Sequence, residues 1–89
     1  MAGAASTVVQ GRAIDAKGRP VAGARVGWAS GPVDLPDVML LTDAKGRFTI
    51  AAPVPGDYTL RCDTDRAGSA SLALQAAGKP LTVTLQLPR

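Results

Sequence analysis

The chain has 89 residues, of which 46% are hydrophobic, 19% charged and 3% aromatic, and it contains one Cys and no His. That length suffices for one domain with a modest core and is too short for two. Without His and with a single thiol, the chain alone supplies no Ser-His-Asp triad, no Cys-His pair and no four-ligand zinc site. A disordered chain is disfavoured, because disordered segments lack this apolar content.

The formal net charge is +3, and the ten Lys and Arg residues are spread along the chain without forming a run. The three aromatic residues are also far apart, so the pattern favours solvated charge over a nucleic-acid surface. The longest run of large apolar residues, 38–41, is far shorter than a bilayer span, and no membrane insertion is expected. Cys62 has no partner for a disulfide within the domain.

The first residues lack the basic start and the apolar stretch of a secretion signal. We therefore expect a cytoplasmic location if the chain is a complete protein. An extracytoplasmic location stays open if it is an excised domain or is exported by a partner. The sequence leaves this choice open.

Seven segments alternate apolar and polar residues between Gly, Pro and Asp clusters, which predicts seven strands. The expected strands are residues 8–15, 24–29, 39–42, 47–51, 58–62, 71–75 and 81–87. Short strands about ten residues apart predict an all-β antiparallel β-sandwich. We expect a flexible N-terminal segment over residues 1–7 and a single domain over residues 8–89.

An inter-sheet core is predicted from the side chains that share the inward face of these strands. The members are Val9, Ala13, Ala24, Val26, Trp28, Phe48, Ile50, Leu60, Leu72, Leu74, Val83 and Leu85. In the first strand, Ile14 is expected to face outward.

A five-residue motif occurs twice, as Asp15-Ala16-Lys17-Gly18-Arg19 and as Asp43-Ala44-Lys45-Gly46-Arg47. The Asp carboxylate can accept from backbone N–H groups two or three residues on, and Gly adopts the left-handed conformation at little cost. Both copies therefore predict a type I turn closed by a Gly bulge, as in a short hairpin. A phosphate-binding loop is the weaker alternative, because no helix follows to supply N–H donors.

Pro53 and Pro55 exclude a central strand, so this segment is expected to cross between strands or sheets. Gly56 then permits the turn into the next strand. Tyr58 follows at the start of that strand, and its hydroxyl is expected to bond back to a backbone carbonyl near this corner.

The longest irregular connection, residues 30–37, is a candidate binding loop that contains Val33, Asp34, Leu35 and Asp37. Two prolines in this loop lower the entropy lost when a partner fixes it. The structural alternative, which we favour, is that Leu35 plugs one open end of the sandwich.

Residues 62–68 form a second candidate loop with Asp63, Asp65 and Arg66. Two aspartates could offer oxygen ligands to calcium, but the further acidic residues of a calcium loop are missing. A polar turn is therefore favoured, and no metal or other cofactor is expected.

Four segments in order carry a resemblance to a known family: residues 9–15, 18–26, 41–50 and 55–60. Together they resemble the carboxypeptidase regulatory-like domain over nearly the whole chain, from about Val8 to Leu87. The resemblance implies a seven-stranded Greek-key, transthyretin-like (prealbumin-like) β-sandwich. It also implies a non-catalytic module of the kind found beside peptidases, in cell-surface proteins and in small bacterial proteins.

We therefore expect a non-enzymatic binding, spacing or scaffold module that recognises a protein, rather than a carbohydrate, through end loops or an exposed sheet edge. The alternative is a structural subunit of a secretion or phage-like particle, or a homo-oligomer built through sheet faces. The mean hydropathy of +0.12 and the outward-facing Ile14 suggest this alternative.

Overall fold

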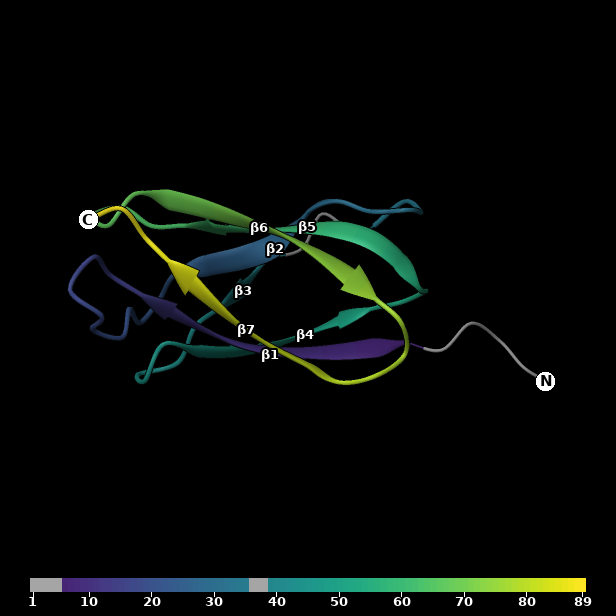
Figure 1. Ribbon diagram of the computed structural model, residues 1–89. Coiled ribbons are helices and arrows are strands. Elements are labelled where there is room, and N and C mark those ends of the chain that lie inside the picture. The colour runs from purple at the N-terminus through teal and green to yellow at the C-terminus, as the bar shows by residue number, and fades with distance from the viewer. Residues whose placement is uncertain (1–5, 36–38) are drawn as a thin grey trace.

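The computed structural model describes residues 6–35 and 39–89, and these residues form seven strands and no helix (Figure 1). The strands are β1 (Thr7–Ile14), β2 (Arg25–Ser30), β3 (Leu40–Leu41), β4 (Arg47–Ala52), β5 (Gly56–Asp63), β6 (Ser69–Ala76) and β7 (Leu81–Gln86). All seven overlap the predicted segments, which confirms the all-β expectation. The described residues contain no helix that is long and apolar enough to cross a membrane.

The strands form two facing sheets, as Figure 1 shows, with orders β4-β1-β7 and β3-β2-β5-β6. All pairings are antiparallel except that of β1 with β7, which is parallel. The predicted sandwich is confirmed, with this one pairing departing from the antiparallel pattern. The reason is that β7 reaches β1 by crossing over from the other sheet, and a crossover allows parallel pairing where a tight hairpin does not.

Most connections lead from one sheet to the other. Only β2 with β3, and β5 with β6, are consecutive strands that pair within a sheet. The segment with Pro53 and Pro55 crosses from β4 to β5, as predicted. The turns 15–19 and 43–47 also join strands of different sheets, so neither closes a hairpin of two paired strands. These turns therefore hold the two sheets together at one end of the molecule.

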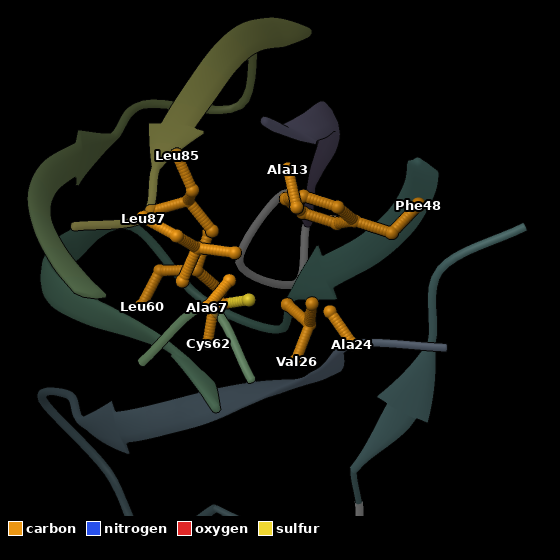
Figure 2. Close-up of a cluster of buried hydrophobic side chains, with 9 residues drawn as sticks. All are labelled: Ala13, Ala24, Val26, Phe48, Leu60, Cys62, Ala67, Leu85 and Leu87. Atoms are coloured by element: carbon orange, nitrogen blue, oxygen red, sulfur yellow. The ribbon is translucent and has the colours of Figure 1, made fainter. Parts of the chain in front are cut away.

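The core lies between the two sheets. Figure 2 shows its main cluster: Ala13, Ala24, Val26, Phe48, Leu60, Cys62, Ala67, Leu85 and Leu87. In β1 the inward positions are buried and the intervening ones are exposed through Arg12, so the alternation read from the sequence holds there. Full burial of a Val, Leu or Phe side chain in such a core stabilises the folded state by roughly 1.5 to 3 kcal/mol.

Five residues expected in the core are only half-buried: Trp28, Ile50, Leu72, Leu74 and Val83. The last four lie in β4, β6 and β7, which are end strands of their sheets, where no further strand covers the side. Alternation gives the face of a residue, but the place of its strand within the sheet decides how deeply that face is covered.

Ile14 lies in the outward register of β1 with Arg12, as predicted, but it is half-buried rather than fully exposed, and it forms an isolated antiparallel bridge with Pro20. On the inward face of β1, Gly11 lies directly opposite Phe48 in the ladder. A Cβ built on Gly11 would overlap the Phe48 ring, so the glycine makes room for the aromatic side chain.

A second, smaller cluster of Ala52, Tyr58 and Ala76 fills the other end of the sandwich. The Tyr58 hydroxyl donates to the carbonyl of Val54 at 2.6 Å, which confirms the expected bond back to the corner. The ring of Trp28 packs against Tyr58 with a centroid separation of 4.8 Å.

Two further contacts define this end. Gly56 opens β5, as predicted, and a Cβ there would lie 2.7 Å from Pro32 Cγ. Thr7 begins β1 one residue before the expected domain boundary. It is buried, and its hydroxyl accepts a hydrogen bond from the Gly78 N–H at 2.8 Å.

Candidate interaction site

Three connections meet at one end of the sandwich, on the left of Figure 1. They are the turn 15–19 after β1, the turn 43–47 before β4, and the loop 64–68 between β5 and β6. The C-terminal residues join them, because the N–H groups of Leu87 and Arg89 donate to carbonyls of β1 and of the 64–68 loop at 2.8 and 3.0 Å. This end of the sandwich, together with the side chains at the adjoining strand ends, is called the cationic end.

The first turn is braced by its own aspartate. Asp15 Oδ1 accepts hydrogen bonds from the backbone N–H groups of Lys17 and Arg19, both at 2.9 Å. The Gly18 N–H donates to the Asp15 carbonyl at 3.0 Å, and Gly18 has a φ of +81°. The bond from the Arg19 N–H is the main cause that lowers the pKa of Asp15 below its ordinary value of 3.8. The predicted turn with a Gly bulge is confirmed.

The second copy repeats these contacts. Asp43 Oδ1 accepts from the N–H groups of Lys45 and Arg47, both at 2.9 Å, and the Gly46 N–H donates to the Asp43 carbonyl at 2.9 Å. The pKa of Asp43 is lowered too, chiefly by the bond from the Arg47 N–H. Both turns are therefore held in place by the same set of bonds, which ionisation of the carboxylate strengthens.

In the third connection, two candidate aspartates are engaged by protein donors. Asp63 accepts from the Ser69 hydroxyl at 2.7 Å and from Arg61 Nε at 3.0 Å, and these bonds, first that of Ser69, lower its pKa. Asp65 accepts from Arg25 at 3.1 Å. No group of three or more His, Cys, Asp or Glu suited to a metal ion is found in the described part of the chain. These bonds support the polar-turn interpretation of this loop.

Positive charge gathers at the cationic end. Each of its four aspartates forms an ion pair with one arginine, at 2.9 to 3.2 Å. Within residues 6–35 and 39–89, five further basic residues of this half of the sandwich have no ion-pair partner. They are Arg12, Lys17, Lys45, Arg66 and Arg89. Nine basic side chains thus meet four aspartates, a surplus of five positive charges, whereas Lys79 lies at the opposite end.

A surface hollow of about 630 Å³ adjoins this charge. Arg12 and Arg47 lie directly opposite each other in the β1–β4 ladder, and both line the hollow. Arg47 is already paired with Asp43, which also lines the hollow, whereas Arg12 has no ion-pair partner among the described residues and is the arginine open to an anionic group. Leu40 and Leu41 also line the hollow, and Leu41 is 65% exposed. The residues that line this hollow were not predicted from the sequence. Arg12 and Arg47 come together only through the register of β1 with β4, which the sequence alone does not give.

The other candidate loop lies at the opposite end of the sandwich (Figure 1). Val33 is 44% exposed and Asp34 is exposed as well. Leu35 packs against the cluster that contains Tyr58, which supports the interpretation that it plugs this end. Asp37 lies outside the described residues.

The structure therefore does not bring the two candidate loops together. Asp63, Asp65 and Arg66 belong to the cationic end, and the loop with Val33 belongs to the far end. A binding site at one end of the sandwich can therefore contain only one of these two loops. The surplus of positive charge favours the loop with Asp63, Asp65 and Arg66.

A comparison with protein families adds to this geometry. The chain matches the family described as carboxypeptidase regulatory-like domain over residues 8–88, nearly its full length. The chain belongs to that family. A search of curated proteins found no match. Regulatory-like domains are transthyretin-like β-sandwiches and are generally non-catalytic modules associated with binding or scaffolding.

The one thiol of this regulatory-like domain lies inside the sandwich. Cys62 is buried in the main cluster, two residues after Leu60 on β5 and opposite Val26 on β2 (Figure 2). Burial first, and the neighbouring Asp63 carboxylate second, raise the pKa of this thiol. The sulfur is therefore held neutral at physiological pH and serves as a small apolar core group.

Proposed function

We propose that this regulatory-like domain is a non-catalytic binding and spacing module that docks an acidic protein partner through its cationic end. The observation that carries the proposal is the surplus of five positive charges there, left after all four aspartates are paired. Charge complementarity of this kind raises the rate of encounter and selects against like-charged partners.

The rigidity of the two repeated turns supports the same proposal. Lys17 and Lys45 each follow an aspartate that binds their own backbone N–H at 2.9 Å. A partner that meets these lysines does not have to order the loops that carry them. Binding costs less free energy when the contacting segments are already fixed in place.

The hollow supplies the apolar part of an interface. Protein interfaces combine buried apolar anchors with arginines, and their energy concentrates in a few such residues. Leu41 is exposed beside Arg12 and Arg47 in this hollow. An acidic segment with one apolar side chain would match both features.

The test is affinity capture from nuclease-treated lysate of the native host, followed by mass spectrometry. The bait is the domain itself, compared with the charge-reversal variant Lys17→Glu/Lys45→Glu/Arg66→Glu at the cationic end. Lys79→Glu is the control, because it reverses a charge at the far end. We expect an acidic protein that wild type and the control retain, that the triple variant loses, and that elutes as salt rises.

Three outcomes would contradict the proposal. The first is recovery of no stoichiometric protein by the wild-type domain. The second is a partner that the triple variant retains as well as wild type does. The third is a partner that the domain captures from a parallel untreated lysate but not from the nuclease-treated one, which would mean that nucleic acid is the ligand.

A further inference from the structure

Strand β6 presents a free edge. It pairs with β5 through all eight of its residues and ends the four-stranded sheet among the described strands. The Thr64 N–H donates to the Gly68 carbonyl at 3.0 Å, so Gly68, the residue before β6, directs its carbonyl toward the β5 side. Along an antiparallel pair the direction of the backbone groups alternates from one residue to the next. It follows that every second residue of β6 directs its backbone N–H and C=O away from β5. These residues are Ser69, Ser71, Ala73 and Gln75.

This edge lacks the features by which sheets block pairing with another chain. Its sequence, Ser-Ala-Ser-Leu-Ala-Leu-Gln-Ala, has no charge and no proline, and its register with β5 runs without a bulge. The other end strands are shorter than β6, and charge or proline lies within or beside β4 and β7. β3 has two residues, β4 begins at Arg47 and is followed by Pro53, and β7 is preceded by Lys79 and Pro80. Long, uncharged edges are the ones that accept an added strand.

We propose that β6 pairs antiparallel with β6 of a second copy of this chain, about a two-fold axis at Ala73. In this register Leu72 lies opposite Leu74 of the second copy, on the inward face. Ser71 lies opposite Gln75 of the second copy, on the outward face. Leu72 and Leu74 are half-buried in the single chain, so pairing covers apolar surface that the sandwich leaves open.

The charge distribution favours a second copy of the chain as the added strand, and it favours antiparallel over parallel pairing. Antiparallel pairing sets the cationic end of each copy beside the far end of the other, which carries Asp34 and Asp57 against a single basic residue, Lys79. Arg61 neighbours Ser71 across β5 and β6, and Asp57 neighbours Gln75. The arginine of one copy and the aspartate of the other therefore fall in one row across the dimer. Parallel pairing would instead place the two cationic ends side by side.

Such a dimer is joined through sheet edges rather than through sheet faces, and it leaves free the turn 43–47, which joins β3 and β4 at the sheet edges away from β6. The proposal is therefore independent of the acidic partner inferred above. Closed two-fold pairing also consumes the β6 edge, so the assembly stops at two copies.

Sedimentation equilibrium of four proteins tests this proposal. Wild type should show a dimer that forms as concentration rises. Ser71→Lys/Gln75→Lys places lysine opposite lysine twice and should raise the dimer dissociation constant about tenfold or more. Ser71→Glu/Gln75→Lys places glutamate opposite lysine in the same positions and should restore dimerisation.

The matched control is Thr82→Lys/Thr84→Lys, which adds the same charge to exposed positions of β7 and should leave the dimer intact. All four substituted positions are exposed, and circular dichroism confirms that each variant is folded. A wild type that stays monomeric at millimolar concentration overturns the proposal. So does a dimer that Ser71→Lys/Gln75→Lys does not weaken, or one that the β7 control weakens equally.

Discussion

The two Asp-Ala-Lys-Gly-Arg turns have the same sequence and the same internal hydrogen bonds, yet their surroundings differ. Gly18 is exposed, and a Cβ built on it would have no atom within 4 Å. Gly46 is buried, and a Cβ there would lie 2.6 Å from the Ala13 carbonyl oxygen and 3.0 Å from the Val21 nitrogen. Local sequence determines the shape of each turn, whereas tertiary contacts decide how much of the fold depends on it.

The contacts of the second turn explain this difference. The Ala13 N–H donates to the Gly46 carbonyl at 2.8 Å, and the Val21 N–H donates to the Ala13 carbonyl at 2.9 Å. The turn before β4 is thereby bonded to the end of β1 and, through it, to the segment that follows the first turn. The first turn lies outside this junction.

Exchanging each glycine for alanine should produce the largest difference between the turns. Gly18→Ala forces a left-handed φ on a residue with a Cβ and should cost about 1 to 2 kcal/mol of unfolding free energy. Gly46→Ala has the same strain and a collision with backbone as well, so it should cost at least about 2 kcal/mol more. Urea denaturation of both variants measures the two losses.

A matched control for this pair is Ala16→Gly against Ala44→Gly, at equivalent exposed positions of the two turns. These two changes should have equal effects, because neither residue belongs to the junction with β1. Equal losses for Gly18→Ala and Gly46→Ala would contradict the difference drawn between the turns.

Acid should affect the two turns equally, because their aspartates make the same contacts. The pKa of Asp15 and of Asp43 is lower in the folded chain than the ordinary 3.8, so the unfolded chain binds more protons in acid. Their contribution is present above pH 3.8 and is lost as pH falls through that value toward the lower folded pKa.

The measurement is the free energy of unfolding at about pH 5 and about pH 3. Asp15→Asn and Asp43→Asn keep an acceptor oxygen and remove the titration, so each should reduce the loss between these pH values by a similar amount. Asp63 also has a lowered pKa, and part of the loss should therefore survive in a variant that carries both Asp15→Asn and Asp43→Asn. A wild type that is more stable at the lower pH would refute this assignment.

The smallest stability effect is expected at the lysines. Lys17→Glu and Lys45→Glu change exposed side chains that form no ion pair within the described residues, so thermal denaturation midpoints should stay within error of wild type. Both should weaken retention of the captured acidic partner to a similar degree. A large loss of stability in one of them alone would show that its lysine has a structural role.

Local patterns were sufficient to predict the strands, both turns and the Tyr58 hydroxyl bond. In each case the residues involved lie within a few positions of one another. Seven regularly spaced strands also sufficed for the sandwich, which the family match confirms.

Features that depend on the order of strands were not predicted. The half-burial of Leu72, Leu74 and Val83 follows from their positions in end strands, which alternation does not reveal. The cationic end was missed because its basic residues are evenly spread in sequence and come together only when β1, β4 and β5 are placed. The arginine pair Arg12 and Arg47 requires the β1–β4 register in the same way.

The most direct test of the docking site is a ¹⁵N–¹H correlation spectrum of the domain titrated with the captured partner. Docking through the cationic end predicts that the amides of Lys17, Gly46 and Arg66 shift together, while those of Val33 and Asp34 stay in place. Shifts centred on Val33 and Asp34, with the three turns unmoved, would contradict the assignment of the site.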